Sequence, residues 1–146
     1  MKLEITDESF RDGPQSLWAN RLRTRDMLPA APHVEAAGLA RANLLSGVGF
    51  EVAVTFLREN PLDRFRLLRR LTPATPSTVL VRSRNLFGWK RHTDDVVTFV
   101  LEHLAGMGLD EFEVFDALND MRNIAFHLRE GARLGLRSSA CLIFAE

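Results

Sequence analysis

The chain reads Phe10-Arg11-Asp12-Gly13-Pro14-Gln15-Ser16-Leu17 directly after a short alternating run, Leu3-Glu4-Ile5-Thr6. The alternation predicts a strand over residues 3–6, and the Gly-Pro turn predicts its end. Arginine offers a planar, permanently charged fork that suits a carboxylate or enolate oxygen, and aspartate offers a hard oxygen ligand for a divalent cation. The stretch therefore predicts a catalytic or ligand-binding site. The alternative is that Arg11 and Asp12 merely cap the next segment or pair with surface charges.

Strand patterns alternate with helical patterns along the rest of the chain. Alternating strands and helices favour parallel pairing, because each crossover returns the chain to the same edge of the sheet. A doubly wound open sheet and a (β/α)8 barrel both satisfy this order. The predicted strands cover 3–6, 40–45, 77–81, 112–115 and 138–144, and the predicted helices cover 24–37, 50–59, 61–71, a segment from Thr93 to Gly106, and 121–134.

Polar residues gather just after each of the first four strands, at 11–15, 46–49, 82–85 and 116–120. In a barrel all βα loops share one mouth, whereas an open sheet concentrates its polar groups at one switch point. No G-x-G-x-x-G follows the first strand, which argues against a dinucleotide site. We therefore expect an α/β fold over residues 1–146: a partial (β/α)8 TIM barrel with about the first four βα units and a fifth strand.

Composition limits the function classes. With 146 residues, 46% of them hydrophobic, the chain can build one core of ordinary size. Lys plus Arg and Asp plus Glu both total 19, so nothing attracts it globally to nucleic acid or anionic membrane. No apolar run approaches the roughly 20 residues of a membrane span, and the N-terminus lacks the apolar core of a secretory signal. The single Cys141 is predicted to be a buried strand thiol in a cytoplasmic protein.

With these clusters in hand, the sequence resembles the carboxyltransferase domain of biotin-dependent enzymes: pyruvate carboxylase, the oxaloacetate decarboxylase alpha subunit and the related transcarboxylase subunit. The likeness covers almost the whole chain in order, and the assignment to this subgroup depends on the loop Phe-Asp-Ala-Leu-Asn-Asp. The matching segments are Asp7 with 10–13, 15–19, 24–29, Arg82 with 85–86 and Gly88, 115–120, and 122–123.

The resemblance implies a role for several residues. Asp12 would be a ligand of a divalent metal (Zn, Mn or Co) that activates the keto acid, and Arg11 would stabilise the enolate oxygen. Gln15 and Arg82 would hold a keto acid such as pyruvate or oxaloacetate, which takes a carboxyl group from biotin on a separate carrier domain. Residues 116–120 would be loop scaffolding, with Asn119 or Asp120 capping the following helix.

Some positions depart from the family pattern. The family places an acidic residue that faces the motif arginine where this chain has Asn43, and a tyrosine of the substrate site where it has Trp89. The remaining metal ligands, a carboxylated lysine and a His-x-His pair, belong to the other half of the barrel. A whole barrel needs about 250 residues, so we expect the remainder of the barrel or a second copy as a partner.

Three hypotheses follow. The chain is part of a metal-dependent carboxyltransferase, or a degenerate non-catalytic half barrel that serves as a binding or assembly module, or an aldolase or lyase of the same metal-dependent barrel type. Two other features have structural interpretations. The basic run in 64–70 is predicted to be a solvated helix face, and His127 is predicted to be structural.

Overall fold

Within residues 3–144, which the computed structural model describes, the chain forms one five-stranded parallel sheet with its strands in sequential order. Sequential order is that of a (β/α)8 barrel, whereas a doubly wound sheet reverses its order at a switch point. The prediction of a partial barrel is therefore confirmed. The strands are β1 (Thr6–Asp7), β2 (Arg41–Ser46), β3 (Ser77–Val81), β4 (Glu111–Phe115) and β5 (Arg137–Cys141).

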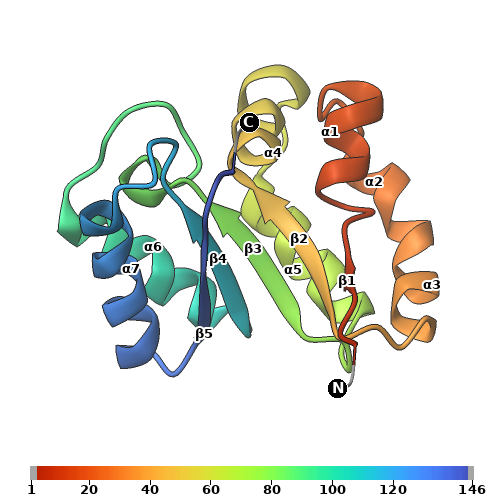
Figure 1. Cartoon of the computed structure of the whole chain (residues 1–146). Helices are drawn as coiled ribbons and strands as arrows, with labels where there is room; N and C mark the ends of the chain where they lie inside the picture. Colours follow the sequence, from red (N-terminus) through yellow and green to blue (C-terminus); the bar gives the residue numbers. More distant parts are fainter. Residues whose placement is uncertain (1–2, 145–146) are drawn as a thin grey trace.

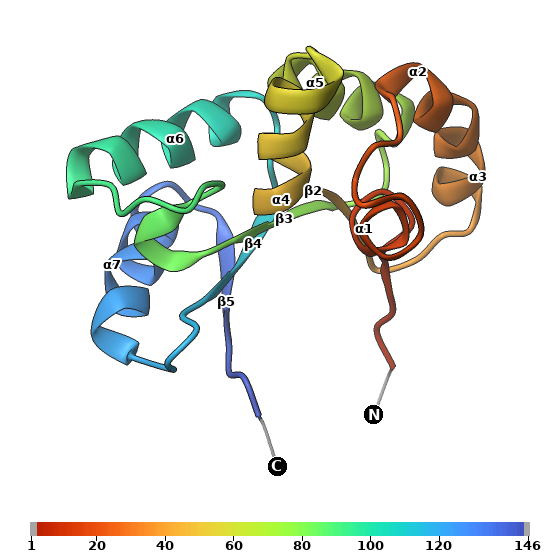
Figure 2. The ribbon, with the colours of Figure 1, turned by 90° about the horizontal axis from the view of Figure 1, so that it is seen from above.

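The helices divide between two places (Figures 1 and 2). Helices α2, α3, α5, α6 and α7 lie along the convex side of the curved sheet, and α1 and α4 stand beyond the carboxyl ends of β1 and β2. The concave side is the side that would face the barrel axis. The helix bounds are α1 (Asp12–Trp18), α2 (Thr24–Met27), α3 (Ala31–Ala36), α4 (Gly47–Val52), α5 (Pro61–Leu71), α6 (Asp94–Gly106) and α7 (Met121–Arg133).

The pleat of the strands separates the core from the concave face. Alternate apolar residues of the strands are buried against the helices, among them Leu44, Val79 and Phe112, each 0% exposed. Each such side chain contributes about 1.5–3 kcal/mol by leaving water. The intervening positions include Asn43 and Glu113, which face the concave side of the sheet. The hydrophobic core thus lies between the sheet and the helices, and polar groups face the interior of the partial barrel.

Several element boundaries differ from the prediction, and the helix predicted over 24–37 is divided into α2, a 3-10 turn and α3. The first strand is Thr6–Asp7, and Gly13-Pro14 lies in the first turn of α1 instead of a strand-ending turn. Proline fits there because its missing N–H would be unpaired in any helix. The expected turn at 46–49 is the start of α4, where the Ser46 hydroxyl accepts a hydrogen bond from the Gly49 amide at 3.3 Å. The fifth strand ends at Cys141 rather than at residue 144.

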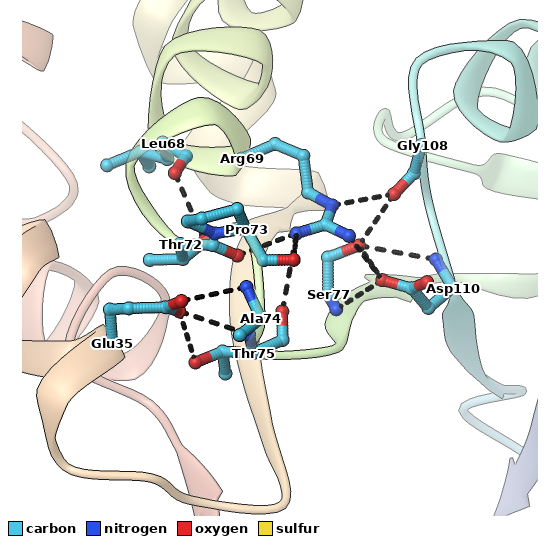
Figure 3. Close-up of polar contacts among 10 residues, drawn as sticks. All are labelled: Glu35, Leu68, Arg69, Thr72, Pro73, Ala74, Thr75, Ser77, Gly108 and Asp110. Carbon is cyan, nitrogen blue, oxygen red and sulfur yellow. Dashed lines mark hydrogen bonds and ion pairs between the residues drawn. The ribbon is translucent and has the colours of Figure 1, made fainter.

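The basic run on α5 is not simply a solvated face. Arg64 is 3% exposed and donates to Glu59 at 3.0 Å and to the Thr24 hydroxyl at 2.9 Å. Arg69 donates to the carbonyls of Thr72 at 2.6 Å and Gly108 at 2.9 Å (Figure 3). Both arginines therefore bind loops together, and for these two residues the prediction was wrong.

The Arg69 cluster lies at the amino ends of the strands. The Arg69 guanidinium is 3.3 Å from the Asp110 carboxylate, which also accepts the Ser77 amide at 2.8 Å. On the other side of the loop, Glu35 accepts the amides of Ala74 at 2.7 Å and Thr75 at 3.0 Å (Figure 3). In a (β/α)8 barrel this end serves stability, and chemistry occupies the other end.

The two outer strands each have one neighbour among the described residues. Apolar side chains near them are exposed, including Ile5 at 51%, Leu142 at 69% and Phe144 at 86%. Unpaired strand edges beside apolar side chains favour association with further strands. Between residues 3 and 144, no helix has both the length and the apolar character needed to cross a membrane.

Candidate functional site

A cavity of about 380 Å³ opens at the carboxyl ends of the strands. It brings together three residues that were predicted from the sequence, namely Arg11, Gln15 and Arg82. They come from the start of α1 and from the loop after β3, so distant segments meet at one mouth. The lining residues are Glu8, Arg11, Gln15, Ser46, Gly47, Val48, Leu80, Arg82, Glu113, Phe115, Cys141 and Ile143.

Arg11 directly precedes α1 and is largely buried, with 21% of its side chain exposed. Its Nη1 donates to Oδ1 of Asp12 at 2.8 Å. Its Nε lies 3.8 Å from Oε2 of Glu8 and is buried without a hydrogen-bond partner. A buried N–H donor without a hydrogen bond carries a desolvation cost, which the nearby Glu8 carboxylate offsets in part.

Arg82 follows β3 and lies across the cavity. Its Nη1 is also buried without a hydrogen-bond partner. Burial lowers the pKa of Arg82, the Glu51 carboxylate raises it, and the neighbouring Arg11 lowers it further. Gly47 makes room for this side chain, since a Cβ there would lie 3.3 Å from Nε of Arg82. An anion in the cavity would offset both the burial and the repulsion between the two guanidinium groups.

Trp89 contacts the site through Arg82. The Arg82 guanidinium carbon lies 4.2 Å from the centroid of the Trp89 ring, a cation–π contact, and the Trp89 side chain is 68% exposed. The tryptophan lines an adjoining cavity of about 460 Å³ with Arg82, Phe115 and Asp116. The structure therefore places Trp89 beside Arg82, at the rim of the mouth.

Asp12 does not line the cavity described above, and about half of its side chain is exposed. Its carboxylate accepts from Arg11 and, at 3.4 Å, from the Ser16 hydroxyl. No group of three or more His, Cys, Asp and Glu side chains able to hold a metal occurs in residues 3–144. A catalytic metal commonly takes about three protein ligands, so the described residues do not by themselves fit a divalent metal. Asp12 as a metal ligand stays a prediction.

Two carboxyl groups in the cavity, Glu8 and Glu113, were not predicted from the sequence. Burial raises the pKa of Glu8, opposed by the hydrogen bond from Asn43 and by Arg11. Burial and the neighbouring Glu111 carboxylate raise the pKa of Glu113. The alternation Glu111-Phe112-Glu113 was a sequence signal for Glu113, because it places both carboxylates on the face opposite the core.

Cys141 also faces this cavity. Cys141 lies on β5, as predicted for a strand thiol, but the prediction that it is buried was wrong, because the side chain is only half-buried and lines the mouth. Burial raises the pKa of its thiol, and Glu113 adds to the effect. A thiol held in its neutral form is a weak nucleophile, so we assign Cys141 to the wall of the cavity.

The loop after β4 is scaffolding, as predicted. Asp120 caps α7 by accepting the Arg122 amide at 3.0 Å, and hydrogen bonds from Arg122 lower the pKa of Asp120 to about 2. Asp116 accepts two loop amides at 3.0 Å, and Asn119 exchanges two hydrogen bonds with the backbone of Ile143 at 2.7 and 2.8 Å. These contacts tie the loop to the segment after β5.

His127 on α7 is structural, as predicted. It is 0% exposed, and its Nδ1 lies 3.2 Å from the carbonyl oxygen of Asn123. Burial lowers its pKa. His127 lines neither of the two cavities described above, so it is not part of the candidate site.

The sequential parallel sheet with a charged cavity at the carboxyl ends of its strands defines a partial (β/α)8-barrel domain. A scan against protein-family models gives no match. A pyruvate carboxylase subunit of Methanothermobacter thermautotrophicus is 38% identical over 127 residues, which are 87% of this chain and 22% of that protein. The methylmalonyl-CoA carboxyltransferase 5S subunit of Propionibacterium freudenreichii subsp. shermanii is 34% identical over 140 residues, which are 96% of this chain and 28% of that protein.

Solved structures agree with these relatives. The carboxyl transferase domain of Rhizobium etli pyruvate carboxylase, solved with 3-hydroxypyruvate and also with oxamate and biotin, superposes with a TM-score of 0.94 at 31% identity. The match covers 99% of this chain and 25% of that one. The chain belongs to the carboxyltransferase family of biotin-dependent carboxylases. It spans 22% and 28% of the two curated relatives named above.

Proposed function

We propose that this chain forms the keto-acid-binding part of a metal-dependent carboxyltransferase site that moves a carboxyl group between biotin and a keto acid such as pyruvate or oxaloacetate. One observation carries the proposal: Arg11 and Arg82 line the same cavity, and Nη1 of Arg82 is buried there without a hydrogen-bond partner. Guanidinium groups suit the planar carboxylate and adjacent keto oxygen of such a substrate. The presence of Gln15 beside them favours this function over a degenerate half barrel.

Each residue has a distinct task in the proposed reaction. Arg82 pairs with the carboxylate or keto oxygen of the substrate, and Gln15 donates an amide hydrogen bond. Arg11 lies where negative charge grows on the keto oxygen as the substrate loses a proton and becomes an enolate. A fixed guanidinium stabilises that charge without reorganisation. With carboxylated biotin bound, the enolate carbon would bond to the carboxyl carbon as the bond from that carbon to the biotin nitrogen breaks. The biotin nitrogen would take up the proton that the keto acid loses, so atoms and charge balance.

The metal and the partners are also proposals. Asp12 is the ligand that this chain would supply, and the other ligands would come from the remainder of the barrel or from a second copy. Such a partner would pair with the outer edges of β1 and β5. The biotin would arrive on a separate carrier domain, whose approach passes the exposed Trp89 at the rim.

Binding of oxamate, an unreactive keto-acid analogue, tests this function without the rest of the barrel. Nuclear magnetic resonance titration of the 146-residue chain should show saturable shifts at the cavity, with affinity reduced about tenfold or more in Arg82→Gln because a charge-assisted pair is lost. Arg25→Gln is the matched control, since that side chain is 80% exposed on α2. Equal loss in both variants, or shifts outside the cavity, would contradict the proposal.

A further inference from the structure

Arg11 needs a fixed orientation, because a guanidinium that stabilises a developing charge acts only from one position. The residue expected to face it is the neutral Asn43, which has no charge to offer. Among the described residues, the ion pairs of Arg11 are with Asp12, through Nη1, and with Glu8, through Nε.

Glu8 contacts the Arg11 segment through its backbone and its side chain. Its carbonyl oxygen accepts the amides of Arg11, Asp12 and Gly13 at 3.1, 2.9 and 3.1 Å. The backbone of Glu8 is therefore fixed to the first turn of α1, and its side chain lies close to the Arg11 side chain. Because three amides converge on one carbonyl, the backbone of Glu8 is fixed, and so is the direction in which its side chain leaves the backbone.

The Glu8 carboxylate is held at one oxygen and faces Arg11 with the other. Its Oε1 accepts a hydrogen bond from Nδ2 of Asn43 at 3.2 Å. Its Oε2 lies 3.8 Å from Nε of Arg11, and both of these atoms are buried without another partner. Asn43 itself is 1% exposed on β2, so it is a rigid donor. These contacts form a chain from the sheet to the guanidinium.

We infer that Glu8 is a positioning residue for Arg11, and that Asn43 acts by holding the Glu8 carboxylate. Glu8 fixes the Nε edge of the guanidinium while Asp12 fixes the Nη1 side, so the plane of the group is set from two directions. Glu8, which directly follows β1, thus supplies the negative charge that Asn43 lacks. The catalytic meaning of this arrangement rests on the proposed function, but the arrangement itself does not.

The Nε–H of Arg11 reports on this contact directly. Its exchange rate with solvent can be measured by nuclear magnetic resonance in the chain without any ligand, with the signal assigned by its loss in Arg11→Lys. Glu8→Gln, which keeps the shape and removes the charge, should speed exchange about tenfold. Asn43→Ala should also speed it, by about threefold, because the carboxylate is then free to move. Glu102→Gln, an exposed glutamate on α6, is the matched control and should leave it unchanged.

The outcomes separate the two proposals. Unchanged exchange in a Glu8→Gln variant that melts like the wild type overturns the positioning role. The role is also overturned if Asp12→Asn speeds exchange and the Glu8 and Asn43 variants do not. If Glu8→Gln does not fold, Asn43→Ala decides, and unchanged exchange there overturns the inference. Failure of the wild-type chain to bind oxamate counts against the proposed function and leaves the exchange result valid.

Discussion

Replacing Arg69 with methionine should lower the free energy of unfolding by about 2–3 kcal/mol. Methionine keeps much of the apolar stem and removes the guanidinium, so the change isolates the polar contacts. Two of them are short bonds from a charged donor to a carbonyl, at 2.6 and 2.9 Å, each contributing about 1.5 kcal/mol at the lower end for such bonds. The side chain is 21% exposed, so water compensates part of the loss.

The assay is urea denaturation followed by circular dichroism, with the slope m compared between variants. Arg66→Met is the matched control on the same helix, because its pair with Asp63 is exposed and should contribute about 0.5 kcal/mol or less. Equal losses in the two variants, or a loss below about 1 kcal/mol for Arg69→Met, would refute the role of Arg69 in joining the loops at the amino ends of the strands.

Three further substitutions give distinct expected results. Gly131→Ala should cost about 1–3 kcal/mol, because the new Cβ would lie 2.8 Å from a buried ring on β4. In His127→Gln the fall of stability between pH 7.5 and 5.5 should be smaller than in the wild type. Burial lowers the pKa of His127, so the unfolded chain binds the proton first as pH falls below about 6.5. Trp89→Leu removes the cation–π contact with Arg82 and should weaken oxamate binding about two- to fivefold.

Each of these three predictions has its own control or contradicting result. Gly106→Ala on α6, where nothing lies within 4 Å of the new Cβ, should be neutral or slightly stabilising in the same denaturation series. For His127 the measured quantity is the difference between the two pH profiles, and parallel profiles would contradict the assignment. For Trp89→Leu, the affinity for oxamate is measured by calorimetry. An unchanged affinity would mean that Arg82 is held in place without the indole ring.

The sequence determined the alternation of strands and helices and the position of the mouth, but it did not predict α1. Residues 77–81 were predicted as a strand and form β3, and the polar clusters after successive strands do meet at one end. These features are local, since the period of a strand or helix shows within about ten residues. The family motifs likewise brought Arg11, Gln15 and Arg82 into the prediction before their convergence was visible.

Tertiary structure alone decided which groups oppose one another. Glu8 meets Asn43 because β1 and β2 pair in the register that sets Thr6 beside Arg41, and a shift by one residue would turn the side chains of a strand to the other face. Arg69 on α5 donates to the carbonyl oxygen of Gly108, 39 residues away, a contact that depends on how the helix packs beside the loop before β4. Periodicity reveals which face of a strand a side chain occupies, but the partner across that face depends on register and on the curvature of the sheet.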